Sequence, residues 1–346
     1  MEEPLLGRTL GELGLIGEIS VKRLGADVVS VRIPVPNHPL LSRLDQALKD
    51  AAGARRVTIE FDLLDDGGRH QLMEKLRAEA GPALGQPGSR TRVIAVSSGK
   101  GGVGKSSVST NLAVALAGSG RRVGIIDGDI WGFSIPRMFG VAHPPVVIDE
   151  SIVPPRAHGV QVMSMDYFVP DDKAVIWRGP MLHKAIEQFL SDVFWDAPDF
   201  LIVDMPPGTG DIAISMAQFL PRAQVLVVTT PQPTAQRVAR RAALMSSQVD
   251  QEVIGVVENM AWFTGDDGRR YLLFGEGGGS ALAAELGVPL MAQIPLLPEM
   301  RQGADEGRPL AVAAPDSEAA AAFAKLATAV EQARPRVRTH PDLVIH

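Results

Sequence analysis

Residues 99–106 decide the fold; they read Gly99-Lys100-Gly101-Gly102-Val103-Gly104-Lys105-Ser106 and fit the pattern GxxxxGK[ST]. They follow an apolar run, Arg92–Val96, and open a helical one, Ser106–Ala117, which is the context that this motif requires. Glycines let backbone N–H groups turn inward around phosphate oxygens, and the N-terminus of the helix adds a favourable dipole. We therefore predict a phosphate-binding loop. A glycine-rich turn with a lysine placed by chance is the alternative interpretation.

Two positions of this loop carry distinct chemistry. The ammonium group of Lys105 is suited to neutralise the β- and γ-phosphates, and the hydroxyl oxygen of Ser106 is suited to bind Mg²⁺. Lys105 is thus a candidate catalytic residue as well as a binding residue, and Ser106 is a candidate metal ligand.

Further carboxylates follow two other apolar runs. Asp127-Gly128-Asp129 ends a predicted strand and can orient water or reach Mg²⁺ through a water, although turn and helix-capping roles are the alternative. Asp204 ends the run Phe200–Asp204, a pattern that brings one carboxylate to the metal of a phosphate pocket through a water. The loop Met205–Asp211 is rigid at its prolines and permissive at its glycines, which suits sensing of the γ-phosphate, whereas a plain proline turn is the alternative.

After residue 91, short β-branched runs alternate with helical stretches. This pattern predicts a mostly parallel sheet buried on both faces and flanked by helices, with ligands at the carboxyl ends of its strands. The strands are expected at Arg92–Val96, Arg122–Asp127, Val160–Met165, Phe200–Asp204, Val225–Thr230, Val253–Glu258 and Leu290–Ile294. The helices are expected at Ser106–Ala117, Met181–Trp195, Ile212–Leu220, Thr234–Val249 and Glu318–Ala333.

A Gly/Pro-rich stretch, Gly81–Gly88, separates this part from a small α/β module. The module has two alternating segments, Val28–Val35 and Arg56–Leu63, around a helix at Pro39–Ala52. We therefore predict a small α/β domain over residues 1–80, a linker over 81–91, a phosphate-loop domain over 92–334 and a tail over 335–346.

Composition narrows the class of protein. The chain of 346 residues has a net charge of −6, which argues against a dedicated nucleic-acid binder. It contains no cysteine, so disulfides, thiolate metal sites and cysteine nucleophiles are excluded. The first residues lack a signal-peptide pattern, and the apolar runs are too short to cross a bilayer. We expect a cytoplasmic protein that uses no membrane.

Lys100, directly after the first glycine, is ordinarily interpreted as a solvated surface lysine. Within a phosphate loop, however, it resembles the deviant motif of the MinD/ParA/nitrogenase-iron-protein superfamily. In that superfamily the early lysine reaches across a dimer to the partner's nucleotide. The resemblance implies an ATP-dependent homodimer in which Lys100 is catalytic.

Six segments together resemble the Mrp/ApbC family of MinD-like ATPases, described as iron–sulfur cluster carriers or assembly factors. The segments, spread over roughly Arg92 to Pro315, are SSGKGGVGKSSVSTNLAVALA, DGDIWGFSIPRM, VIWRGPMLHKAI, IVDMPPGTGD, GVVENMAWF and FGEGGG. The resemblance implies a P-loop NTPase fold, with the first 80 residues similar to a small metal–sulfur maturation domain.

This resemblance also implies residue roles, with ATP and Mg²⁺ as cofactors. Asp129 would position the attacking water, Asp204 would sit by Mg²⁺, and Asn259 would recognise adenine, although a buried Asn can also cap a turn. The residues implied around the nucleotide are Gly99, Lys100, Gly101, Gly102, Val103, Gly104, Lys105, Ser106, Ser107, Asn259 and Pro295.

The chain departs from the family where most members carry Cys-x-x-Cys, two from each subunit binding a bridging cluster. Residues 262–270 instead read WFTGDDGRR, a polar Asp-Gly turn suited to a hairpin tip. The cysteine of the small domain is also absent, with His38 near its place. Asp266, Asp267 and His38 can bind iron weakly, but such residues in loops are more often solvated. Cluster binding by the thiolate chemistry of the family is therefore in question.

Two main functions compete at this point. The leading hypothesis is a dimeric, slowly hydrolysing ATPase that carries or assembles iron–sulfur clusters with scaffold or recipient proteins, a partner or small thiol supplying ligands. The alternative is a MinD/ParA-like nucleotide-switched regulatory protein that binds no cluster. The tail 331–346 lacks a basic amphipathic face, which disfavours a membrane role. A small-molecule kinase or synthetase is a third possibility, without a visible acceptor pocket.

Overall fold

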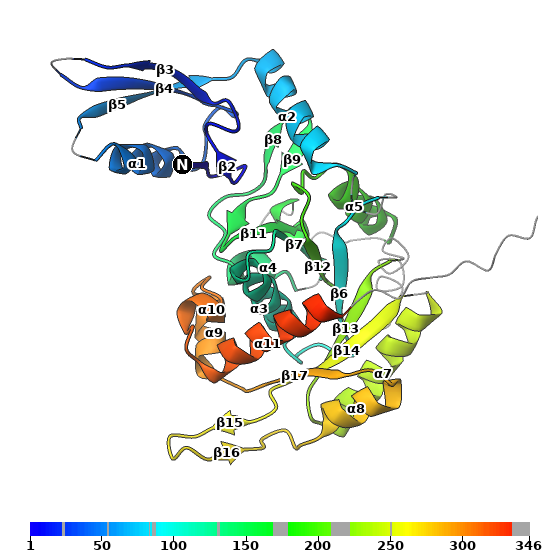
Figure 1. Cartoon of the computed structure of the whole chain (residues 1–346). Helices are drawn as coiled ribbons and strands as arrows, with labels where there is room; N and C mark the ends of the chain where they lie inside the picture. Colours follow the sequence, from blue (N-terminus) through cyan, green and yellow to red (C-terminus); the bar gives the residue numbers. More distant parts are fainter. Residues whose placement is uncertain are drawn as a thin grey trace, which may run out of the picture.

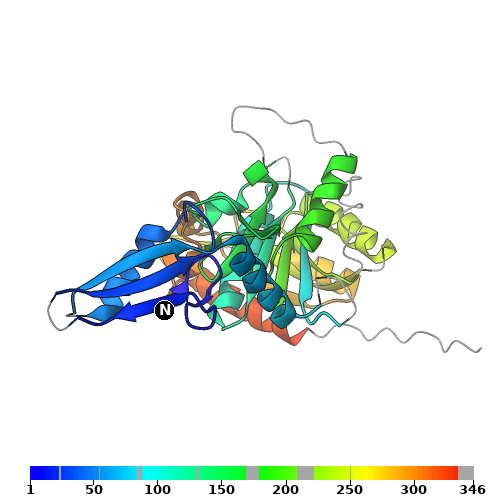
Figure 2. The ribbon, with the colours of Figure 1, turned by 90° about the horizontal axis from the view of Figure 1, so that it is seen from above.

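A computed structural model describes residues 1–22, 25–53, 55–82, 84, 88–129, 132–168, 179–208, 222–249 and 251–333, with the backbone alone at 179–183. A smaller N-terminal part projects from one side of a larger part built around one long sheet (Figures 1 and 2). Within these residues no helix has the length and apolar character needed to cross a membrane.

The long sheet has eight strands in the order β10-β11-β7-β12-β6-β13-β14-β17. Only the β10–β11 pair is antiparallel. The mostly parallel sheet predicted from the apolar runs is therefore confirmed. The bounds are β6 (Arg92–Ser98), β7 (Val123–Asp127), β10 (Arg156–Ala157), β11 (Val160–Ser164), β12 (Phe200–Asp204), β13 (Gln224–Thr229), β14 (Glu252–Asn259) and β17 (Leu290–Ile294).

Helices cover both faces of this sheet because its strands are apolar on both sides (Figure 1). In β6, for example, Ile94 and Val96 join the core under α3 and α11, while the intervening Ala95 joins the core on the opposite face. The first face holds α3 (Lys105–Gly118), α4 (Ile135–Met138), α10 (Leu310–Ala313) and α11 (Glu318–Gln332), with α9 (Pro298–Asp305) beside α4 and α10. The second face holds α5 (Gly179–Ser191), α7 (Pro233–Gln248) and α8 (Gly278–Leu286).

Two helix predictions need comment. The predicted helix Met181–Trp195 is wrong at its end, because α5 stops at Ser191 and the next residues pair with a strand. Val193 forms a parallel bridge to Ile152, and the N–H of Phe194 donates to the carbonyl of Ile152 at 2.8 Å. The predicted helix Ile212–Leu220 lies outside the described residues.

The N-terminal part has a three-stranded sheet, a separate two-stranded sheet and two helices. Its strands and helices are β1 (Glu2–Glu3), β2 (Arg8–Thr9), β3 (Ile16–Ser20), β4 (Asp27–Ile33), β5 (Val57–Leu63), α1 (Leu41–Ala52) and α2 (Asp66–Ala80). Its predicted α/β character is confirmed. Helix α2, absent from the prediction, begins where the side chain of Asp65 accepts the N–H of Gly68 at 2.7 Å.

A hairpin of the larger part packs into the core of the N-terminal part. The hairpin consists of β8 (Val146–Ile148) and β9 (Ser151–Val153). Ile148, Val153 and Phe194 belong to the same buried cluster as Leu44 and Met73 of the N-terminal part. The two parts thus share apolar contacts, and the proposed division at residues 81–91 stays a prediction.

Candidate functional site

The glycine-rich loop lies between β6 and α3, and several of its positions favour glycine because of backbone conformation or close packing. Gly102 and Gly104 both have φ +80°, a conformation that side chains disfavour. A Cβ on Gly99 would lie 2.2 Å from the backbone carbon of Val238, and one on Gly104 would lie 2.2 Å from Nδ2 of Asn259. The loop is therefore closely packed from behind by α7 and the end of β14.

A cavity of about 290 Å³ opens in front of this loop. Its lining brings together eight of the predicted site residues with four others from neighbouring segments. Gly99, Val103, Asp204, Asn259 and Pro295, also predicted, do not line it. The lining residues are Ser98, Lys100, Gly101, Gly102, Gly104, Lys105, Ser106, Ser107, Asp129, Ser134, Met138 and Pro207.

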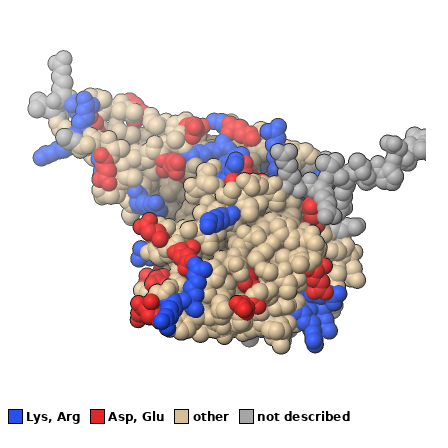
Figure 3. All heavy atoms as spheres, turned by 60° about the horizontal axis from the view of Figure 1, so that its bottom comes forward, with Lys and Arg blue, Asp and Glu red and all other residues tan. Residues whose placement is uncertain are grey.

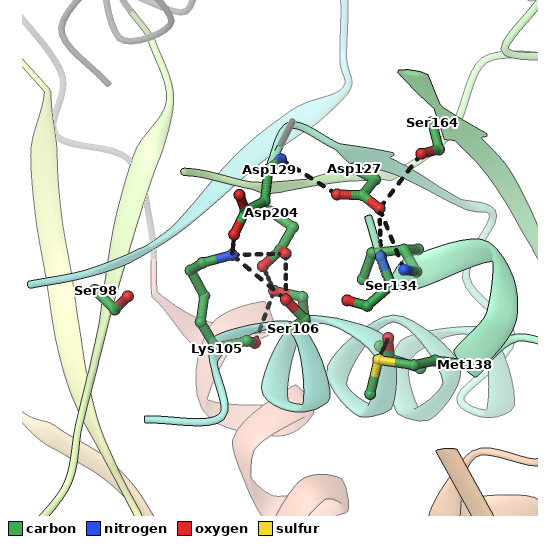
Figure 4. A network of polar contacts seen from close by, with 12 residues as sticks. Ser98, Lys105, Ser106, Asp127, Asp129, Ser134, Met138, Ser164 and Asp204 are labelled. Carbon is green, nitrogen blue, oxygen red and sulfur yellow. Dashed lines mark hydrogen bonds and ion pairs between the residues drawn. The ribbon is translucent and has the colours of Figure 1, made fainter. Parts of the chain in front are cut away.

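Asp204, at the end of β12, is the fully buried centre of the polar network behind this cavity (Figure 4). Its Oδ2 accepts from the ammonium of Lys105 at 2.7 Å and from the hydroxyl of Ser106 at 2.7 Å. Its Oδ1 accepts from the hydroxyl of Ser109 at 2.6 Å. A buried carboxylate is costly unless charged and hydrogen-bonded partners surround it, and all three partners come from α3.

Asp127, at the end of β7, anchors the segment that follows it (Figure 4). Its Oδ1 accepts the N–H of Asp129 at 3.2 Å, and its Oδ2 accepts the N–H groups of Ser134 and Ile135, each at 3.2 Å. The hydroxyl of Ser164 lies 3.3 Å from the same Oδ2. These bonds fix the backbone on both sides of the Asp129 side chain.

Three carboxylates thus gather around the ammonium of Lys105. Oδ2 of Asp129 lies 4.0 Å from that ammonium, and Asp204 and Asp127 are register partners on adjacent strands. Burial first, and then the nearby charge of Asp204, raise the pKa of Asp127 from its ordinary value to about 7, against the opposing effect of the N–H donors and Lys105. The hydroxyl of Ser106 and the carboxylates of Asp129 and Asp204 are oxygen donors of the kind that a nucleotide-bound Mg²⁺ prefers.

Lys100 and Asn259 lie on the α7 and β14 side of the loop. The ammonium of Lys100 donates to Oε1 of Gln232, directly before α7, at 3.3 Å. Nδ2 of Asn259 donates to the carbonyl of Val103 at 2.9 Å, while its Oδ1 is buried and has no hydrogen-bond partner among the residues that the structure describes. Asn259 pairs with Ile294 on the neighbouring strand β17, and Pro295 directly follows Ile294. Asn259 and Pro295 therefore lie close together at the carboxyl ends of these strands. An unsatisfied buried acceptor of this kind is rare and points to a missing donor.

The sequence did not predict one residue of this polar network, Ser109, and did not define the role of another, Asp127. Ser109 was not predicted, although it lies one helical turn after Lys105 and therefore on the same face of α3. Asp127 was predicted only as one of a pair of strand-end acids; three of its donors are backbone N–H groups of the segment that follows it, and the fourth is Ser164 of a neighbouring strand. Spacing within the motif can reveal Ser109, whereas the contact between Asp127 and Ser164 requires the strand order.

Of the candidate iron ligands, His38 lies in a different part of the structure from Asp266 and Asp267, and both His38 and Asp267 are hydrogen-bonded to other side chains. His38 is buried, with Nε2 2.7 Å from Oε1 of Glu3. The Asp-Gly turn does form a hairpin tip, between β15 (Phe263–Thr264) and β16 (Arg270–Tyr271). There Asp267 accepts the hydroxyl of Tyr271 at 2.9 Å.

No group of three or more His, Asp or Glu side chains suited to a metal occurs in the described part of the chain. With no cysteine in the sequence, the described residues do not fit an iron–sulfur cluster.

Charges of both signs alternate on the face turned forward in Figure 3. The described residues also form exposed ion pairs, among them Arg301 with Asp305 at 2.8 Å and Arg240 with Glu285 at 2.6 Å. This face presents no continuous basic stripe among the described residues.

The whole architecture has known relatives. Residues 89–331 match the family model described as "ParA: NUBPL iron-transfer P-loop NTPase". An iron–sulfur cluster carrier protein of Mycobacterium leprae is 45% identical over 328 residues, which cover 91% of this chain and 86% of that protein.

Two solved structures share the fold. One is a nucleotide-binding protein of Archaeoglobus fulgidus in complex with ADP, 36% identical, with a TM-score of 0.58 over 67% of this chain and 91% of that chain. The other is the septum site-determining protein MinD of Pyrococcus horikoshii complexed with Mg-ADP, 26% identical, with a TM-score of 0.55 over 70% of this chain and 96% of that chain. The chain therefore belongs to the iron-transfer P-loop NTPases of the Mrp/ApbC family, the iron–sulfur cluster carriers, as a member without cysteine.

Proposed function

We propose that this chain binds Mg²⁺ and ATP in the cavity before residues 99–106, hydrolyses ATP slowly as a homodimer, and acts in iron–sulfur cluster assembly in the cytoplasm. The observation that carries the nucleotide part is the contact of Lys105 and Ser106 with the buried Asp204 beneath a glycine-rich loop. The nucleotide complexes of the two solved relatives support the same assignment.

The oxygen donors behind the cavity fit Mg²⁺, which prefers hydroxyl, carboxylate and phosphate oxygens. Bound there, Mg²⁺ supplies positive charge to the phosphate oxygens. Ser106 would hold the metal through its hydroxyl oxygen, with its O–H donating to Asp204 as it does in this structure. Lys105, whose ammonium is mobile on a four-carbon stem, exchanges Asp204 for phosphate oxygens.

Hydrolysis is assigned to Asp129 and Lys100. Asp129 faces the cavity on a backbone held by Asp127, so its carboxylate is placed to orient a water molecule. Lys100 also lines the cavity, beside the start of α7. In the proposed dimer its ammonium reaches the nucleotide of the other copy and stabilises charge on the leaving phosphate.

Adenine recognition is assigned to Asn259, with Pro295 beside it. Oδ1 of Asn259, which accepts no hydrogen bond from the described part of the chain, is an acceptor that the exocyclic amine of adenine can satisfy. Reorientation of the amide away from Val103 is part of this proposal. The packing of Asn259 against Gly104 then links base binding to the phosphate loop.

The iron–sulfur cluster is the cargo in this proposal, and its ligands come from outside the chain. Family membership supports the role, and the absence of thiolates requires that a scaffold protein, a recipient protein or a small thiol supply the sulfur ligands. The same absence favours the second candidate function, a nucleotide-switched regulatory ATPase that binds no cluster.

Anaerobic reconstitution separates these functions. Iron and sulfide content and the ultraviolet–visible spectrum are recorded with and without ATP, for the chain alone, with glutathione, and with a cysteine-containing scaffold protein. A carrier is expected to acquire cluster absorption only when an external thiol is present. A colourless protein under all three conditions, still able to bind ATP, contradicts the carrier role and supports the regulatory one.

A further inference from the structure

The two oxygens of Asp204 have different surroundings. Oδ2 faces Lys105 and Ser106 and is the oxygen directed toward the cavity residues. Oδ1 accepts from Ser109, whose side chain is fully buried in α3. No other hydrogen bond to Oδ1 occurs within the described residues.

The hydroxyl proton of Ser109 has two acceptors within reach. The carbonyl of Lys105, one turn earlier, lies at 3.1 Å, which is the ordinary contact of a serine inside a helix. Oδ1 of Asp204 lies at 2.6 Å, a length typical of a hydroxyl that donates to a charged oxygen. The shorter contact to the charged acceptor therefore holds the proton.

The hydrogen bond from Ser109 to Oδ1 fixes the orientation of the Asp204 carboxylate about its last side-chain bond. Rotation of a carboxylate about its last bond has broad minima, so packing alone orients it poorly. Asp127 lies on the adjacent strand and opposes the charge of Asp204. A donor on Oδ1 both stabilises the buried charge and keeps Oδ2 directed at Lys105 and Ser106.

We infer that Ser109 is a positioning residue for Mg²⁺-dependent nucleotide binding, acting through Asp204. The inference rests on the proposed function, since it assigns Asp204 to the metal site. Ser109 itself does not touch the cavity, so its removal leaves the contacts of the phosphate loop with nucleotide intact.

The test uses a matched pair of buried helical serines. Ser246 in α7 donates to the carbonyl of Ala242 at 3.1 Å, the same backbone contact that Ser109 makes, but among the described residues it has no carboxylate partner. The dissociation constant of a fluorescent ADP is measured for the wild type, Ser109→Ala and Ser246→Ala, in EDTA and in Mg²⁺. The ratio of the two constants gives the enhancement by Mg²⁺.

Ser109→Ala is expected to reduce the Mg²⁺ enhancement about tenfold, the effect of one hydrogen bond to a charged group. Affinity in EDTA and the enhancement in Ser246→Ala are expected to match the wild type. Ser109→Cys, with a weaker donor of similar size, is expected to fall between wild type and Ala, and provides the answer if Ser109→Ala does not fold.

A double-mutant cycle tests whether Ser109 acts through Asp204. In an Asp204→Asn background, Ser109→Ala is expected to have no further effect on the Mg²⁺ enhancement. An undiminished enhancement in Ser109→Ala, or an equal loss in the Asp204→Asn background, overturns the inference while leaving ATP binding standing. A wild type that binds no nucleotide overturns the proposed function and this inference together.

Discussion

The ammonium of Lys105 lies 2.7 Å from Oδ2 of Asp204, the same oxygen that accepts the hydroxyl of Ser106 at 2.7 Å. Lys105 thus neutralises the carboxylate that we assign to Mg²⁺. The ammonium and the water of a metal ion would compete for this oxygen of Asp204, and nucleotide phosphates relieve the competition by attracting the lysine. Metal and nucleotide binding are therefore expected to be strongly coupled.

This coupling predicts that Lys105→Ala changes the affinities for metal and for nucleotide in opposite directions. Without nucleotide, the variant is expected to bind Mn²⁺, as a probe for Mg²⁺, several-fold more tightly than the wild type because the competing cation is gone. Electron paramagnetic resonance titration of free Mn²⁺ measures this, with the exposed Lys49→Ala as control. Equal or weaker Mn²⁺ binding by Lys105→Ala contradicts the competition.

Lys100→Ala separates binding from dimer-dependent turnover. The ammonium of Lys100 donates to Gln232 of its own chain, and the phosphate loop keeps its other donors, so the variant is expected to bind ATP with an affinity close to that of the wild type. Its hydrolysis and its ATP-driven dimerisation are expected to fall at least tenfold, because the ammonium acts on the nucleotide of the other copy. Phosphate release and sedimentation velocity with ATP are the measurements; unchanged turnover rules out the cross-dimer role.

Asp129→Asn is expected to bind Mg²⁺ and ATP normally and to lose hydrolysis by roughly 10²–10⁴-fold, the range for removal of a general base. The substitution keeps the backbone N–H that Asp127 accepts, so the loop keeps its anchor. Single-turnover phosphate release measures the chemical step. Persistence of near-wild-type turnover assigns water activation to a different group.

The raised pKa of Asp127 predicts a pH dependence of stability. Its ordinary value is 3.8 and its value in the fold is about 7, so folding favours the protonated form. The stabilisation from that protonation is complete below pH 4 and is lost as the pH rises through 7. Between pH 5 and pH 8 this loss amounts to about 2–3 kcal/mol.

Asp127→Asn isolates this effect, because the amide cannot ionise. In EDTA, the thermal unfolding midpoint of the wild type is expected to fall relative to that of Asp127→Asn as the pH rises from 5 to 8. Contributions from other titrating groups cancel in the difference. Two curves that run parallel over this range contradict the assigned pKa.

The sheet and the acids at its strand ends could be predicted because each depends on local sequence. Runs such as Phe200–Asp204 are apolar on both faces and end in a charge, and parallel strands bring such ends to one edge. The packing of Asn259 behind Gly104 was beyond sequence reasoning, because it depends on which strands become neighbours. The strand order, rather than any motif, creates that contact.

The β8–β9 hairpin was also missed, for a conformational reason. Its turn residues, Asp149 and Glu150, both have positive φ, which hairpins usually achieve with Asn-Gly or Asp-Gly. With the ordinary turn signal absent, two short runs of three residues resemble a loop. Their pairing is stabilised by burial of Ile148 and Val153 against the N-terminal part, a long-range contact.

The central claim, that Lys105 and its neighbours bind ATP with Mg²⁺, is tested most directly by isothermal titration of ATP into the wild type and Lys105→Ala in Mg²⁺. We predict saturable binding by the wild type that weakens sharply in EDTA, and no measurable binding by Lys105→Ala at the same concentrations. Equal ATP affinity in the two proteins would contradict the account, because the phosphates would then be held by other residues.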